Sequence, residues 1–186
     1  LGAALLFGAN TPFAKQLVGD MPPVLLAGLL YLGSGVGLWA FRTLWERTID
    51  IPHLSSREWL WLLGAIASGG VLGPVLLMVG LSHTSASQAS LLLNLEAVLT
   101  AVLAWVVFRE NADRQIVIGM FLIVAGGLLL ALPQGGGVGS GSTLGDLAVA
   151  AACLCWALDN NLTRKVSATD AVFLAGTKGL VAGVTN

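Results

Sequence analysis

Long apolar runs, each close to the length of a membrane-crossing helix, dominate this sequence of 186 residues. A helix needs about 20 predominantly apolar residues to cross the hydrocarbon core of a bilayer. Only 10% of the residues are charged, whereas soluble domains contain about 25%. The runs occupy residues 1–18, 24–44, 59–81, 85–108, 116–132 and 144–162, and a further run begins at 171. We therefore predict an all-α, multi-pass membrane protein with six spanning helices and part of a seventh.

Basic residues gather in alternate connections between these runs. Seven of the nine Lys and Arg residues follow the second, fourth and sixth runs: Arg42, Arg47, Arg57, Arg109, Arg114, Arg164 and Lys165. The opposite connections contain only Lys15, and Lys178 lies within the seventh run. Because Lys and Arg are enriched in cytoplasmic loops, this bias predicts a plasma (inner) membrane protein with a cytoplasmic N-terminus.

Composition and motifs argue against several function classes. A net charge of −1 without a basic cluster provides no surface for nucleic acid. Neither HExxH nor GxSxG occurs, and the two histidines lie in connections on opposite sides, so we do not expect an enzyme. Cys153 and Cys155 are interpreted as small core residues of the sixth run. No metal, cofactor or disulfide is expected.

Glu96 is the most informative single residue, because it lies near the centre of the fourth run. An acidic residue there costs about 3 kcal/mol on insertion scales, and intramembrane carboxylates tend to mark ion or substrate pathways. If 85–108 is one helix, Ser85, Ala89, Glu96 and Thr100 share a face, with Asn94 nearly opposite. Glu96 and Thr100 are therefore candidate pathway residues, with Glu96 exchanging protons with a hydrated cavity. The alternative is a structural carboxyl that stays protonated or pairs with a neighbouring helix.

Two further charges enter the apolar runs at similar depth. Asp159 precedes the end of the sixth run, and Lys178 lies in the seventh. Because opposite charges at one depth can neutralise each other, we predict an Asp159–Lys178 ion pair bordering the same pathway. In the alternative, both side chains reach separately toward the cytoplasmic surface.

Proline interrupts two of the runs. Pro12 cannot donate a backbone hydrogen bond and should break the first helix, which makes the neighbouring Asn10 a candidate pathway residue. A simple kink, with Asn10 bonded to the freed backbone, is the alternative. Pro74 should kink the third helix near Gly69 and Gly73.

An internal repeat relates the second and seventh runs. A shift of 148 positions matches Leu26-Ala27-Gly28, Leu32 and Gly35-Val36 with identical residues between 174 and 184. Chance similarity is the alternative. The first unit would hold five spans, and an odd number inverts the second unit in the membrane. We predict a first repeat at 1–133, a Gly-rich extracytoplasmic linker at 134–143 and the start of a truncated second repeat at 144–186.

Glycines spaced four apart predict close helix packing rather than a dimer motif. The pairs are Gly33 with Gly37, Gly69 with Gly73, and Gly179 with Gly183.

Four short segments carry a family resemblance: FGANTP at 7–12, GL at 80–81 with TSAS at 84–87, FRE at 108–110, and the glycines from 119 to 127. Their order and spacing resemble the EamA-like family of the drug/metabolite transporter superfamily. The resemblance implies ten helices in two inverted five-helix repeats, with a central cavity that alternates its opening. Many members carry a proline in the fourth helix where this chain has NLEA at 94–97.

The resemblance, together with the charged residues Glu96, Asp159 and Lys178 inside the apolar runs, predicts a secondary-active transporter. It would export a small metabolite or drug-like solute, coupled to protons through Glu96, with membrane lipid as its surroundings. A non-enzymatic channel or a structural membrane protein is the alternative.

Overall fold

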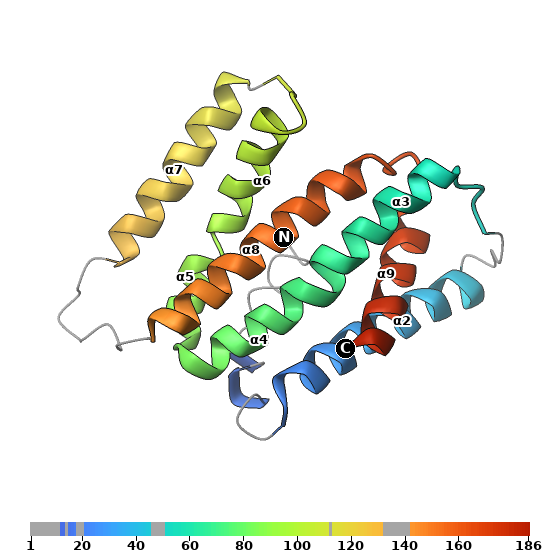
Figure 1. Ribbon diagram of the computed structural model, residues 1–186, viewed down its shortest axis with the longest axis horizontal. Coiled ribbons are helices and arrows are strands. Elements are labelled where there is room, and N and C mark those ends of the chain that lie inside the picture. The colour runs from blue at the N-terminus through green and yellow to red at the C-terminus, as the bar shows by residue number, and fades with distance from the viewer. Residues whose placement is uncertain (1–11, 14, 18–20, 46–50, 112, 132–141) are drawn as a thin grey trace.

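The computed structural model describes residues 12–13, 15–17, 21–45, 51–111, 113–131 and 142–186. All regular structure in these residues is helical, so the predicted all-α class is confirmed (Figure 1). The elements are α2 (Pro23–Leu44), α3 (Ser56–Ala65), the π-helix η1 (Ile66–Leu72), α4 (Gly73–His83), α5 (Ala86–Leu92), α6 (Leu95–Val106), α7 (Arg114–Ala131), α8 (Thr143–Arg164) and α9 (Ala171–Thr185). The sequence predictions for Asn10 and for the linker at 134–141 fall outside the described residues.

Three stretches within the described residues are long and apolar enough to cross a membrane: Val24–Leu44, Ser56–His83 and Ala86–Val106. Arg114–Gly126 and Ala171–Thr185 are shorter apolar helices. The helix α8 is as long as a span but more polar, and it lies between α6 on one side and α3, η1 and α4 on the other (Figure 1). The neighbouring helices bury two of the polar residues of α8, Asp159 and Asn161.

The helices α2 and α9 pack against each other in antiparallel orientation through glycine. A Cβ added at Gly35 would lie 2.4 Å from the backbone nitrogen of Leu180, and one added at Gly183 would lie 2.5 Å from the Cα of Leu32. Such approaches exclude any side chain, so the two backbones touch directly.

The glycine predictions are confirmed for two of the three pairs. Gly179 and Gly183 form the α2 contact, while Gly69 and Gly73 pack against Asp159 and Trp156 of α8. The prediction for Gly33 and Gly37 is wrong, because a Cβ at either position meets nothing within 4 Å. The helix α2 instead turns the face that carries Gly28, Leu32 and Gly35 toward α9.

Ion pairs join the connections that the charge pattern assigned to one side. Arg42 at the end of α2 is 2% exposed and lies 2.7 Å from Asp170, which precedes α9. The hydrogen bond from the amide N–H of Phe173 lowers the pKa of Asp170 below its ordinary value, and the positive charge of Arg42 lowers it further. Arg164 at the end of α8 pairs with Glu110, which follows α6. The ends of the second, fourth and sixth runs therefore lie together, as predicted.

The kink predicted at Pro74 takes the form of a π-helix. The N–H of Gly73 donates to the carbonyl of Ser68, five residues back, instead of to Gly69. This register leaves the Gly69 carbonyl without a backbone donor, because its next partner would be Pro74, which has no N–H.

The fourth run is not one continuous α-helix, which corrects the prediction for 85–108. At its centre the N–H groups of Asn94 and Glu96 donate to carbonyls only three residues back, at 3.2 and 3.1 Å. The Asn94 side chain donates to the carbonyls of Ser90 and Leu91 at 3.3 and 3.0 Å. An asparagine that binds its own helix in this way competes with the regular ladder, which accounts for the break between α5 and α6.

Candidate functional site

A cavity of about 730 Å³ lies between α6, α7 and α8. One part of its wall is apolar and includes Trp105, Ile116, Val117 and Met120. The polar part includes Glu96, Thr100, Asn160, Asn161, Glu110 and Arg164. An apolar cavity with a few convergent polar groups is the usual form of a small-molecule site.

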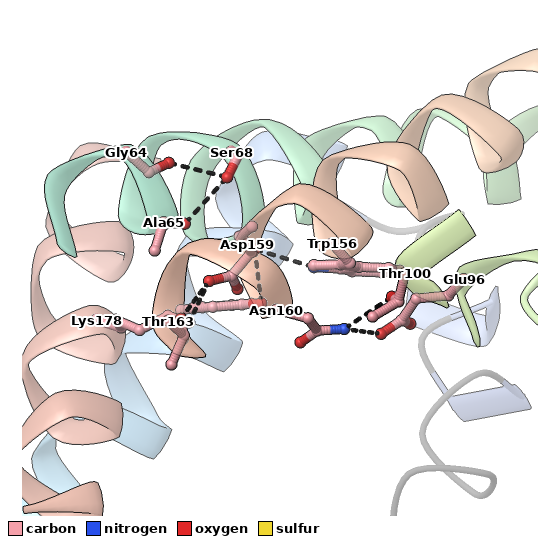
Figure 2. A network of polar contacts seen from close by, with 12 residues as sticks. Gly64, Ala65, Ser68, Glu96, Thr100, Trp156, Asp159, Asn160, Thr163 and Lys178 are labelled. Atoms are coloured by element: carbon pink, nitrogen blue, oxygen red, sulfur yellow. Dashed lines mark hydrogen bonds and ion pairs between the residues drawn. The ribbon is translucent and has the colours of Figure 1, made fainter. Parts of the chain in front are cut away.

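Glu96 and Thr100 meet α8 at this cavity through one asparagine. Asn160 Nδ2 donates to Glu96 Oε1 at 2.9 Å and approaches Thr100 Oγ1 at 3.4 Å. Figure 2 shows the Asn160 side chain reaching from α8 toward both residues. The two candidates from the fourth run thus share one site. Ser85 and Ala89, which the continuous-helix prediction put on the same face, do not line the cavity: Ser85 caps α5 and Ala89 is buried in the core.

Asn161 fixes the neighbouring backbone. It is 3% exposed, and its Nδ2 donates to the carbonyl of Thr100 at 3.0 Å and to that of Ala157 at 2.8 Å. Sequence reasoning missed both asparagines and used only Asp159. The signal was available, because Asp159-Asn160-Asn161 is a run of three polar residues inside an otherwise apolar segment.

The ion pair predicted between Asp159 and Lys178 is present. Lys178 Nζ lies 2.5 Å from Asp159 Oδ1, and the side chains are 17% and 10% exposed. Thr163 donates its hydroxyl to the same oxygen at 2.8 Å and accepts from Lys178 at 3.1 Å. A second cavity, of about 350 Å³, borders this pair between α2, α8 and α9. The prediction that these charges line a transport pathway remains a prediction.

The Gly69 carbonyl connects three helices close to this pair. It accepts from the indole N–H of Trp156 at 2.9 Å and from the hydroxyl of Tyr31 at 3.1 Å. These bonds replace the backbone donor that Gly73 and Pro74 do not supply. Asp159 packs directly on Gly69, since an added Cβ there would lie 2.1 Å from Asp159 Oδ2. The π-helical register of η1 is therefore held by side chains of α2 and α8.

We expect Trp156→Phe to lower the free energy of unfolding by about 0.5–1.5 kcal/mol for the lost hydrogen bond, with Tyr31→Phe costing a similar amount. The double variant leaves the carbonyl without either donor and should cost more than the sum of the two. Unfolding of all four proteins in mixed micelles gives the coupling between the two side chains. Simple additivity would contradict a shared role in satisfying Gly69.

Comparison with known proteins agrees with a membrane transporter. Residues 1–132 match the EamA-like transporter family. An uncharacterized transporter of Methanothermobacter thermautotrophicus is 28% identical over 97% of this chain and 57% of its own length. The uncharacterized transporter YyaM of Bacillus subtilis is 29% identical over 89% of this chain and 54% of its own length. The chain thus spans a little over half the length of these relatives.

A solved crystal structure shares the fold, with a TM-score of 0.70 at 22% identity over 98% of this chain and 62% of that chain. Together with the apolar helices, the family match indicates an integral membrane protein, and members of the family are transporters and not enzymes. The chain belongs to the EamA-like transporter family.

Proposed function

We propose that the full-length protein is a secondary-active transporter that exports a small metabolite or drug-like solute by alternating access. The solute would occupy the cavity between α6, α7 and α8. One observation carries the proposal: an intramembrane carboxylate, a carboxamide and an apolar wall converge on a cavity of about 730 Å³. An apolar surface favours the body of an amphiphilic solute, and the polar groups orient it.

Glu96 is the proposed proton carrier. Its hydrogen-bond partner is the neutral Asn160. The nearby cations have other partners, because Lys178 pairs with Asp159 and Arg164 pairs with Glu110. A carboxylate without a cationic partner can lose and regain a proton as the cavity changes its opening, whereas a carboxylate paired with a cation stays charged while that pair is intact. The proposed pathway also includes Thr100, and Asp159 with Lys178 at the second cavity. Asn10 remains a candidate from the sequence alone.

Inverted repeats, at 1–133 and from 144 onward with a linker between them, are part of the proposal. The contacts between α2 and α9 support them. The shift of 148 positions makes Gly35 equivalent to Gly183 and Leu32 equivalent to Leu180. Gly35 contacts Leu180, and Gly183 makes the equivalent contact with Leu32. Equivalent antiparallel helices are related by a twofold axis perpendicular to them, which lies in the membrane plane when the helices span the bilayer. Ten helices in total, and a cytoplasmic N-terminus in the plasma membrane, complete the proposal.

We expect Glu96→Gln to abolish the response of transport to a pH gradient while leaving gradient-free counterflow. The glutamine keeps the size and the hydrogen bond of Glu96 but cannot carry a proton. Proteoliposomes of the full-length protein, with ethidium and a metabolite mixture as probes, measure both fluxes. If one proton is exchanged per solute, a gradient of one pH unit supplies about 1.4 kcal/mol, which corresponds to about tenfold accumulation of the solute by the unsubstituted protein.

The matched control is Glu110→Gln, because Glu110 lines the same cavity but is paired with Arg164. This variant should keep its pH response. An unchanged pH response in Glu96→Gln would reject the proton carrier, and flux without saturation or counterflow in the unsubstituted protein would indicate a channel.

A further inference from the structure

The second cavity has its own polar lining, which includes Asp159, Thr163 and Lys178. These residues lie on the far side of Asn160 from Glu96 (Figure 2). Lys178 and Asp159 form part of its wall, and the hydroxyl groups of Ser34, Ser167 and Thr169 lie around it. Leu174 and Ala175 supply an apolar portion. Its volume of about 350 Å³ suits a molecule with one charged group and a short apolar body.

The hydrogen-bonding capacity around this cavity favours an anion. An ammonium group has three donors, and Lys178 uses two of them on Asp159 and Thr163. The third donor is left for a ligand. Within the described part of the chain, the hydroxyls of Ser34, Ser167 and Thr169 have no hydrogen-bond partner, so they can donate to the same ligand.

Asp159 is poorly placed to receive a ligand cation. Its Oδ1 already accepts from Lys178 and Thr163, at 2.5 and 2.8 Å. Its Oδ2 lies against Gly69, where there is no room even for a methyl group. A cation would have to displace Lys178, whereas an anion can bind to the free donor of Lys178 directly.

Charge balance sets the condition for anion binding. The titratable groups around Asp159 in the described residues are Tyr31 from α2, Lys178 from α9 and, on the other side of α8, Glu96 from α6. The π-helix η1 presents only Gly69. The charges of Asp159 and Lys178 cancel, so an added monovalent anion would leave one buried negative charge. A proton on Asp159 removes that charge and leaves Lys178 as the partner of the anion. A phosphate dianion would exceed the single charge of Lys178 and would lack the arginine fork that usually binds it.

We propose that this cavity binds a small monocarboxylate together with one proton, which Asp159 takes up as Lys178 turns to the ligand. The only bond formed is the O–H bond of the Asp159 carboxyl group, whose proton comes from the solvent, and the anion replaces the carboxylate as the partner of the Lys178 ammonium. The site is distinct from the Glu96 cavity and does not depend on the role of Glu96.

Calorimetric titration of the full-length protein in detergent micelles tests the site, with benzoate as the probe. Titrations between pH 6 and 8 in two buffers of different ionisation enthalpy count the protons. We expect uptake of about one proton per benzoate, and a one-proton linkage of this kind makes the affinity fall about tenfold per pH unit across this range. Benzyl alcohol, benzylammonium and chloride should not compete. Competition by benzylammonium, or binding without proton uptake, would overturn the proposal.

Variants separate the two charges. Asp159→Asn should bind benzoate with no proton uptake, independently of pH, and more tightly than the unsubstituted protein at pH 8. Lys178→Gln should lose binding. Ser34→Ala leaves the ion pair intact and should weaken binding about three- to tenfold through one lost hydrogen bond. Proton uptake that persists in Asp159→Asn would reject Asp159 as the proton acceptor.

Glu96→Gln distinguishes this inference from the proposed function. It should retain the full benzoate-linked proton uptake even though its pH-driven transport is lost. If it loses the uptake, the monocarboxylate site is wrong while the Glu96 carrier stands. If it keeps both the uptake and the pH-driven transport, the carrier role is wrong while the site stands.

Discussion

Replacing Lys178 with leucine is expected to lower the free energy of unfolding by about 3–5 kcal/mol, because the Asp159 carboxylate is left without its cationic partner in a buried position. Thr163 would still donate to Asp159, but one neutral hydroxyl cannot replace the charge of the ammonium group. Chemical unfolding of the purified protein in mixed micelles measures the loss.

The control is Asp159→Asn with Lys178→Leu, which removes both charges. This double variant should recover most of the lost stability, since the cost of Lys178→Leu arises mainly from the unpaired charge and not from the missing contact. Asp159→Asn alone should be milder than Lys178→Leu, because the asparagine oxygen can still accept from Lys178. If the double variant is as unstable as Lys178→Leu, the ion pair does not determine the loss.

Sequence reasoning predicted this pair because charges are scarce in the apolar runs. Asp159 and Lys178 lie at similar distances from the neighbouring ends of the sixth and seventh runs, and this similarity was enough to predict the pair. Because charges are scarce, their distribution also predicted which connections share one side of the membrane. The ion pairs of Arg42 with Asp170 and of Arg164 with Glu110 agree with that prediction. Long-range contacts can be predicted where few partners compete.

Backbone irregularities were harder to predict, because their stability depends on distant helices. The sequence indicated a disturbance at Pro74, but the π register also requires donors for the Gly69 carbonyl from Tyr31 and Trp156. These residues lie in other runs, and no periodicity pairs them. The same holds at the break in the fourth run, where the thiol of Cys153 lies 3.5 Å from the carbonyl of Leu92.

The candidate site was only partly predicted, because some of its residues are brought together by packing between helices. Glu96 is one turn before Thr100 in α6, so their shared face follows from helical spacing alone. Ser85 and Ala89 belong to α5, beyond the break, and a continuous-helix projection misplaced them. Asn160 required the packing of α8 on α6, which the sequence did not specify.

Replacing Gly35 with alanine should lower the free energy of unfolding by about 1–3 kcal/mol, because the new methyl group would lie 2.4 Å from the backbone of Leu180. Backbone atoms cannot move aside as a flexible side chain can, so α2 and α9 must separate. The matched control is Gly37→Ala on the same helix, where a Cβ meets nothing within 4 Å. Alanine favours helix over glycine by about 1 kcal/mol, so this control should be neutral or stabilising.

Gly183→Ala extends the comparison to the proposed second repeat. Its methyl group would lie 2.5 Å from the backbone of Leu32. In the repeat, Gly183 is equivalent to Gly35 and Leu32 is equivalent to Leu180, so this contact is the counterpart of the one between Gly35 and Leu180. If α2 and α9 are equivalent helices of inverted repeats, Gly35→Ala and Gly183→Ala should cost similar free energies of unfolding. In combination they should cost less than their sum, because the first substitution already separates the helices and makes room for the second. Strict additivity would mean that the two glycines act on independent contacts, which a common interface does not allow.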